Sequence, residues 1–277
     1  MSATFQTIVT AQQLKDLLGD PNLVVVDCRF SLADVTSGRA AYDASRIPGA
    51  VYAHLDDDLS GPPHTDHGRH PLPSPERMAA TFSRLGIDDT KQVIAYDDRN
   101  NMMASRLWWM LKYMGHRNIA VLDGGWTAWQ SSGGEIETSS PQVPTVVEFS
   151  GQPNPNWLVM LDQVDAQQKL VDSRASERFR GDVEPLDPAA GHIPGAVNFH
   201  YARVLNDDAT FQDPDSIRQH MSELFGDSNP KDVTFYCGSG VSACVNLIAA
   251  SHAGFPMSKL YVGSWSEWSR KKAKPEA

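Results

Sequence analysis

Four short blocks of this sequence occur twice, in the same order and at a nearly constant separation. Each half carries Asp-x-Arg after an apolar run, an Ile-Pro-Gly-Ala-Val block, an apolar run that ends in Tyr, and a Gly-x-Trp block. The paired ranges are 24–29 with 169–174, 47–51 with 193–197, 93–96 with 233–236, and 124–126 with 263–265. Four matches in one order indicate a duplicated domain rather than a short solenoid repeat.

The chain length agrees with this duplication, because 277 residues are enough for two domains of ordinary size. We predict a first domain over residues 1–135, a linker over 136–156 and a second domain over 157–277. The connecting segment is rich in Gly and Pro, which favours irregular structure. Within it, the run from Val146 to Phe149 is predicted to form a short strand.

Each half alternates short β-branched runs with longer amphipathic stretches, a pattern typical of α/β domains with a mainly parallel sheet flanked by helices. The predicted strands are 23–27, 92–96, 119–122, 169–172, 233–236 and 259–262. The predicted helices are 11–18, 75–85, 104–114, 216–224 and 242–252.

The composition argues against several classes of protein. With 34 acidic and 24 basic side chains the net charge is −10, so the positive surface expected of a nucleic-acid-binding protein is missing. The apolar runs are far shorter than the ~18 residues of a membrane span, and the N-terminus lacks the pattern of a secretory signal. We therefore expect a cytoplasmic protein with neither a nucleic-acid nor a membrane partner.

The segment after the predicted strand 233–236 carries the clearest chemical signal. It reads Cys-Gly-Ser-Gly-Val-Ser-Ala from Cys237 to Ala243, and a helix is predicted to begin near Ser242. Ligands bind at the carboxyl edge of parallel sheets. The two glycines, Gly238 and Gly240, let the loop curl so that its backbone N–H groups converge on the cysteine sulfur. These groups and the helix N-terminus would stabilise a thiolate nucleophile.

The other two cysteines, Cys28 and Cys244, are interpreted as packed thiols, which is the usual state of a buried cysteine. An odd number of cysteines without Cys-x-x-Cys spacing also argues against a disulfide framework and a structural zinc site. In the first half the position of Cys237 is taken by Asp97, and no glycines follow it. The sequence therefore predicts one active half and one supporting half.

These motifs resemble those of the tandem-domain rhodanese-type sulfurtransferases, most of all the 3-mercaptopyruvate branch. The resemblance covers nearly the whole chain and rests on four blocks: 172–174, 191–196, 237–243 and 263–268. It implies two rhodanese-like domains, of which the first is non-catalytic. It also implies a ping-pong reaction, in which Cys237 takes sulfur from a small-molecule donor as a persulfide and passes it on. The acceptor would be thioredoxin, a low-molecular-weight thiol or cyanide, and the chemistry needs no metal or organic cofactor.

The loop composition bears on the donor. Thiosulfate-type relatives carry basic residues directly after the cysteine, whereas Gly238 and Ser239 are neutral. By resemblance, Arg178 binds the donor carboxylate, which suits the two-pronged guanidinium. A second substrate arginine of the family aligns with Asp187, so Arg180 is the candidate to replace it. The loop residues Gly238, Gly240, Val241 and Ser242 complete the predicted donor site.

The resemblance also implies a group that assists the leaving group. Ser239 matches the loop serine of the family, and His70 and Asp56 match residues that assemble with it. From the residues alone, Ser239 could equally be a turn hydroxyl and His70 a solvated loop histidine. Two other functions remain open: a thiosulfate sulfurtransferase, and a non-catalytic rhodanese module for binding or regulation. A cysteine-dependent phosphatase is disfavoured, because its phosphate-binding arginine position is Ala243 here.

Overall fold

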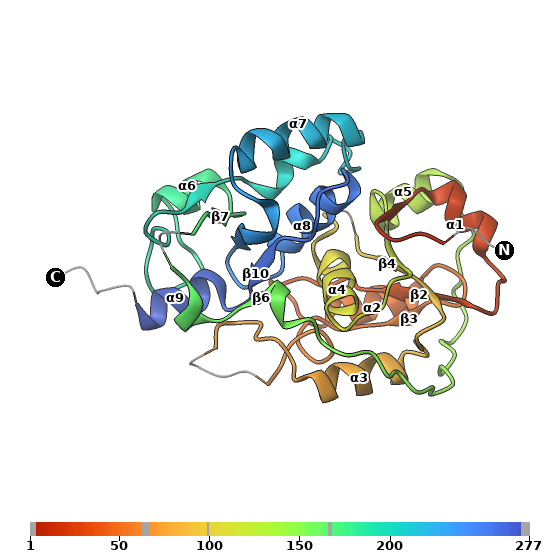
Figure 1. Ribbon diagram of the computed structural model, residues 1–277. Coiled ribbons are helices and arrows are strands. Elements are labelled where there is room, and N and C mark those ends of the chain that lie inside the picture. Colours follow the sequence, from red (N-terminus) through yellow and green to blue (C-terminus); the bar gives the residue numbers. More distant parts are fainter. Residues whose placement is uncertain (1–3, 63–66, 99, 166–167, 273–277) are drawn as a thin grey trace. The chain divides into compact units, whose positions relative to one another are not determined.

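A computed structural model describes residues 4–62, 67–98, 100–165 and 168–272 (Figure 1). The chain divides into two compact units. Unit 1 comprises Met1–Leu59, Pro73–Pro153 and Asp208–Thr210, and unit 2 comprises Ser60–Leu72, Asn154–Asp207 and Phe211–Ala277. Each unit thus includes a short segment from the other half of the sequence. The domain boundaries that we placed at residues 135 and 156 stay predictions.

Unit 1 contains a five-stranded sheet with the order β1-β5-β4-β2-β3, in which every pairing is parallel. Its strands are β1 (Ile8–Val9), β2 (Leu23–Asp27), β3 (Val51–Tyr52), β4 (Gln92–Tyr96) and β5 (Ile119–Leu122). Its helices are α1 (Ala11–Leu17), α2 (Ser37–Ala44), α3 (Pro75–Arg84), α4 (Met102–Tyr113) and α5 (Gly125–Ser131).

Unit 2 repeats this sheet, because its order β6-β10-β9-β7-β8 pairs the corresponding strands, again all in parallel. Its strands are β6 (Leu158–Val159), β7 (Leu170–Asp172), β8 (Val197–Asn198), β9 (Thr234–Tyr236) and β10 (Lys259–Tyr261). Its α-helices are α6 (Ser176–Arg180), α7 (Pro214–Phe225), α8 (Ala243–His252) and α9 (Ser264–Lys271). Short 3-10 turns lie at Pro155–Trp157, Leu161–Gln163, Tyr201–Val204 and Pro230–Asp232. The predicted α/β duplication is confirmed.

The Asp-x-Arg blocks brace equivalent places in the two units. Arg29 pairs with the buried Asp27 at 2.6 Å, and its guanidinium lies 4.7 Å from the ring centre of Trp126. In unit 2, Arg174 pairs with Asp172 at 2.6 Å and lies 5.0 Å from the ring of Trp265. A buried charge needs such a partner, so both arginines have a structural role.

The predicted elements differ from the structure mainly at their ends and where strands are short. Strands β1, β3, β6 and β8 have two residues each, too few to show an alternating pattern. The strand predicted at Val146–Phe149 is wrong, since these residues form no strand. Their backbone turns instead to α3, where the N–H of Val147 donates to the carbonyl of Ser83 and that of Phe149 to its hydroxyl, both at 3.1 Å.

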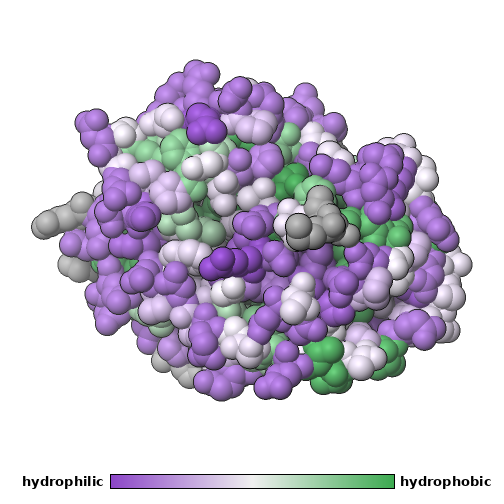
Figure 2. Space-filling view, turned by 45° about the vertical axis from the view of Figure 1, so that its right-hand side comes forward, coloured by the Kyte–Doolittle hydropathy of each residue, from purple (hydrophilic) through white to green (hydrophobic). Residues whose placement is uncertain are grey.

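Hydrophilic residues cover most of the surface that Figure 2 shows, with small apolar patches between them. None of the helices among the described residues is both long enough and apolar enough to cross a membrane.

Candidate active site

Cys237 follows β9 directly, at the carboxyl edge of the unit 2 sheet, and only 1% of it is exposed. The loop that continues to α8 is buried as well. Gly240 has a φ of +74°, and a Cβ atom there would lie 2.5 Å from the carbonyl oxygen of Val262. A residue with a side chain would therefore be both strained and blocked at this position, so glycine is what allows the loop to curl against β10.

Three backbone N–H groups of this loop stand out because they belong to buried residues. Within the part of the chain that the structure describes, those of Ser239, Val241 and Ala243 have no hydrogen-bond acceptor. More than nine in ten buried N–H groups in proteins are paired. Three unpaired donors in one buried loop indicate a site for an anion.

The equivalent loop of unit 1 shows what such an anion does. There the carboxylate of Asp97 accepts the N–H groups of Asn101 at 2.9 Å, Met103 at 3.0 Å and Ala104 at 3.2 Å. Burial raises the pKa of Asp97 to about 6, which these hydrogen bonds oppose. Unit 1 thus fills its loop with its own carboxylate, whereas unit 2 has a cysteine there and leaves the donors open.

The block that contains Gly263 and Trp268 braces the Cys237 loop from the side. The N–H of Cys237 donates to the Ser264 hydroxyl at 3.1 Å, and the N–H of Trp265 returns a bond to the Cys237 carbonyl at 3.0 Å. The N–H of Ser266 donates to the carbonyl of Gly238 at 2.8 Å. These bonds fix the loop backbone on both sides of the cysteine.

Ser266 also attaches the 60–72 segment to this site. Its hydroxyl accepts the N–H of Arg69 at 3.1 Å. Gly68, with a φ of +80°, permits the close approach, because a Cβ atom there would lie 2.7 Å from the Ser266 hydroxyl. The next residue, His70, is buried, and its Nδ1 lies 2.7 Å from the Ser239 hydroxyl. The structure therefore brings together the predicted residues Ser239 and His70.

The two candidate arginines of α6 have different surroundings. Nη2 of Arg178 donates to both oxygens of Glu184, at 2.7 and 2.9 Å, and lies 3.5 Å from Asp187. Burial pushes the pKa of Glu184 upward, but hydrogen bonds from Arg178 and backbone N–H groups outweigh it and hold the pKa below its usual value. Arg180 instead forms a 2.7 Å pair with Asp182 in which both side chains are more than half exposed.

Asp56 lies in unit 1, where it is half-buried and lines a pocket of about 740 Å³ with residues of α2. Burial raises the pKa of its carboxyl, an effect that His54 opposes and Asp57 reinforces. A catalytic role for Asp56 stays a prediction.

The remaining cysteines are packed thiols, as predicted. Cys28 is fully buried, and this burial raises the pKa of its thiol, with Asp27 and Asp97 adding to the effect. Cys244 is fully buried in the first turn of α8, and its Sγ donates to the Gly240 carbonyl at 3.4 Å.

Sequence reasoning did not select Arg69, although it directly precedes His70. Its Nη2 would lie 2.9 Å from a Cβ atom on Gly238, and Arg178 reaches the same point at 3.5 Å. Asp187, noted in the sequence only as a missing arginine, forms an ion pair with Arg69, and its side chain is fully buried. Two features of the sequence could have indicated this pair. A basic residue, Arg69, stands beside the matched His70, and an acidic residue, Asp187, stands where the family has an arginine.

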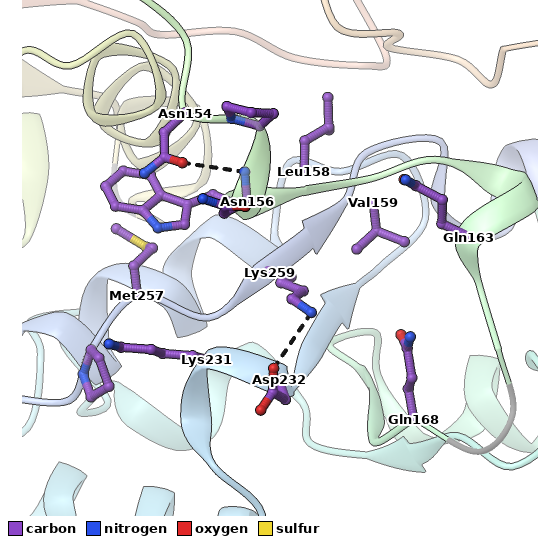
Figure 3. Close-up of a pocket in the computed structure, with 13 residues that line it drawn as sticks. Asn154, Asn156, Leu158, Val159, Gln163, Gln168, Lys231, Asp232, Met257 and Lys259 are labelled. Carbon is purple, nitrogen blue, oxygen red and sulfur yellow. Dashed lines mark hydrogen bonds and ion pairs between the residues drawn. The ribbon is translucent and has the colours of Figure 1, made fainter.

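A separate pocket of about 760 Å³ lies at the opposite edge of the unit 2 sheet (Figure 3). Gln168, Asp232 and Lys259 line it, and they stand just before or at the start of β7, β9 and β10. Lys259 pairs with Asp232 at 3.6 Å. Since the strands are parallel, this pocket is at their amino ends, whereas Cys237 is at the carboxyl end of β9.

Comparisons with known proteins identify the family of this chain. A family model of the rhodanese-like domain matches residues 10–132 and 156–271. A Pseudomonas aeruginosa protein, provisionally named 3-mercaptopyruvate sulfurtransferase, is 42% identical over 277 residues, covering 98% of this chain and 97% of the relative. A Mycobacterium tuberculosis protein, provisionally named thiosulfate sulfurtransferase, is 41% identical over 285 residues, covering 99% and 98%.

Among solved structures, the 3-mercaptopyruvate sulfurtransferase from Leishmania major matches with a TM-score of 0.88 and 29% identity, covering 98% of this chain and 76% of that one. The sheet order, the duplicated blocks and these matches lead to one conclusion. The chain belongs to the rhodanese family, as a tandem-domain sulfurtransferase similar to the 3-mercaptopyruvate sulfurtransferases.

Proposed function

We propose that this enzyme moves a sulfur atom from 3-mercaptopyruvate to a thiol or to cyanide through a persulfide on Cys237, and releases pyruvate. The observation that carries the proposal is the set of three N–H groups after Cys237, those of Ser239, Val241 and Ala243, that have no acceptor among the described residues. Such donors stabilise a thiolate before the reaction and a persulfide anion after it. In this proposal unit 2 is catalytic and unit 1 supports it, since Asp97 already occupies the equivalent loop.

In the first half-reaction the Cys237 thiolate attacks the sulfur of the donor. An S–S bond forms, the carbon–sulfur bond breaks, and its electron pair leaves with the three-carbon fragment as pyruvate enolate. The proton of the donor thiol then moves to the enolate, which gives pyruvate and leaves the Cys237 persulfide anion. Ser239, 2.7 Å from Nδ1 of His70, is the hydroxyl that we propose to relay this proton.

In the second half-reaction the acceptor attacks the outer sulfur of the persulfide. A thiolate acceptor becomes a persulfide and cyanide becomes thiocyanate, while Cys237 is released as a thiolate. No external oxidant or reductant takes part. The proposed partners are therefore one sulfur donor and one nucleophilic acceptor, either a small thiol, a thiol protein such as thioredoxin, or cyanide.

The donor preference rests on charge. Directly after Cys237 stand two uncharged residues, Gly238 and Ser239. Arg178, a neighbour of Gly238, offers one guanidinium to a carboxylate. This arrangement suits a monoanion such as 3-mercaptopyruvate. Thiosulfate is the second candidate donor, because the Mycobacterium tuberculosis relative carries that name.

Mass spectrometry tests the reaction. After treatment with 3-mercaptopyruvate we expect one additional sulfur atom on the peptide that contains Cys237, and its loss on addition of a thiol. A steady-state comparison of donors should give a higher kcat/KM for 3-mercaptopyruvate than for thiosulfate. The reverse ranking would select the thiosulfate alternative, and absence of the sulfur adduct with both donors would leave a non-catalytic rhodanese module.

A further inference from the structure

Two arginine side chains, rather than one, reach the residue next to Cys237. A methyl group on Gly238 would lie 2.9 Å from Nη2 of Arg69 and 3.5 Å from Nη1 of Arg178. Arg178 belongs to α6, and Arg69 comes from the 60–72 segment, which is part of the same unit. Two guanidinium groups from separate parts of the sequence therefore approach Gly238, the residue that follows the candidate nucleophile.

A buried carboxylate holds the two cations together. Nη1 of Arg69 donates to one oxygen of Asp187, and Nη2 of Arg178 lies 3.5 Å from the other. The Asp187 side chain is 0% exposed, whereas each arginine side chain is 19% exposed. Because like charges repel each other, the carboxylate that both arginines contact stabilises their placement side by side.

The Arg69 guanidinium keeps one edge open. Its Nε is buried and has no acceptor within the described residues. The ion pair with Asp187 is formed by Nη1, so it leaves Nη2 on the same edge as Nε unused. Nε and Nη2 present two parallel N–H groups, the spacing that fits the two oxygens of a carboxylate. A buried donor without a partner is costly, so this edge is suited to an oxygen supplied by a ligand.

We propose that Arg69 is a specificity-determining residue, whose open edge binds the donor carboxylate together with Arg178. In this proposal Asp187 offsets part of the positive charge of the two arginines, so that they favour a donor with a single negative charge. The inference rests on the proposed function, because it names part of the same donor site. Arg69 and Arg178 are matched by Asp187 and Glu184. A monoanion gains hydrogen bonds at this site. The second negative charge of thiosulfate gains little, because the carboxylates already balance the positive charges of the arginines.

The position of Arg69 also explains why this chain has Asp187 where the family has a second substrate arginine. Arg180, the replacement suggested by the sequence, is 59% exposed and paired with Asp182. Arg69 instead takes its place beside Gly238 through the bond of its N–H to Ser266, which itself donates to the carbonyl of Gly238. The acidic side chain at 187 and the basic one at 69 are thus two halves of one arrangement.

Steady-state kinetics with both donors test this inference in the full-length enzyme. For Arg69→Gln we expect kcat/KM for 3-mercaptopyruvate to fall about 10- to 100-fold, mainly through KM, as for loss of a charge-assisted hydrogen bond. Arg69→Lys keeps the positive charge but lacks the two parallel N–H groups. It should therefore recover less than half of the loss in the logarithm of kcat/KM that Arg69→Gln shows. The control is Arg218→Gln on the exposed face of α7, with unchanged kinetics.

Asp187→Asn supplies the second arm. Removing this negative charge should move the ratio of kcat/KM values about 10-fold toward thiosulfate, whatever the change in overall rate. A wild-type KM in Arg69→Gln, or an unchanged donor ratio in Asp187→Asn with a native thermal unfolding profile, would overturn the inference. If Asp187→Asn fails to fold, Arg69→Gln alone decides.

Sulfur loading separates this inference from the proposed function. At saturating donor, Arg69→Gln should still acquire one sulfur on Cys237, because Arg69 binds the donor and does not carry the sulfur. If the wild-type enzyme takes sulfur and Arg69→Gln has the wild-type KM, only the inference about Arg69 fails. If the wild-type enzyme takes sulfur from neither donor, the proposed function fails as well.

Discussion

Substituting Gly238 with alanine probes the donor site with a single methyl group. Gly238 is not among the glycines with positive φ, so alanine adopts the same backbone without strain. Its Cβ would lie 2.9 Å from Nη2 of Arg69, whereas ordinary contact begins near 3.4 Å. The guanidinium edge must therefore retreat by about 0.5 Å, at the far end of a flexible side chain.

We expect this retreat to weaken the donor hydrogen bonds by about 1 kcal/mol, since complete loss of a charge-assisted bond costs about 1.5–3 kcal/mol. This corresponds to a fall of about 5-fold in kcat/KM for 3-mercaptopyruvate, with a rise in KM and little change in the thermal unfolding temperature. The assay is steady-state pyruvate release at varied donor concentration.

A double-mutant cycle with Arg69→Gln identifies the cause. If alanine acts by displacing Arg69, it should have almost no further effect in the Arg69→Gln background, which gives a coupling free energy of about 1 kcal/mol. An undiminished 5-fold loss in that background would contradict displacement of Arg69 as the cause. It would show that the methyl group disturbs the Cys237 loop directly.

Three further outcomes are expected. Cys237→Ser should abolish sulfur transfer and the sulfur adduct seen by mass spectrometry, whereas Cys28→Ser and Cys244→Ser should retain both; loss in a folded Cys244→Ser would assign it a role in the site. Arg178→Ala should lower kcat/KM for 3-mercaptopyruvate about 30- to 100-fold through KM, and an unchanged KM would remove it from the donor site. Burial raises the pKa of Asp97 from its ordinary value of 3.8 to about 6 in the folded protein. Its protonated form therefore stabilises the fold by about 3 kcal/mol below about pH 4, and this contribution is lost as the pH rises through about 6. Asp97→Asn should flatten the dependence of unfolding free energy on pH in that window, measured by denaturant unfolding, and an unchanged slope would contradict the assignment.

Local chemistry made much of the architecture predictable. Strands such as Leu23–Asp27 and Gln92–Tyr96 were predicted with the bounds that the structure has, because long apolar β-branched runs are unambiguous. The two-residue strands, such as Val51–Tyr52, were not predicted, because their pairing depends on partners elsewhere in the chain. The strand predicted at Val146–Phe149 is wrong for the same reason. Its backbone N–H groups donate to Ser83 instead of to a neighbouring strand.

The duplication, the α/β class and the placement of Cys237 in a glycine-containing loop after a strand could all be predicted from the sequence. All three follow from residues that are neighbours in the chain, where spacing dictates local geometry. The charged side chains that face that loop became apparent only from the folded chain. Ser266 and Arg69 are 197 positions apart, and Arg69 and Asp187 are 118 apart. Contacts at such separations are set by how a unit packs as a whole, because packing brings together side chains that no local pattern relates.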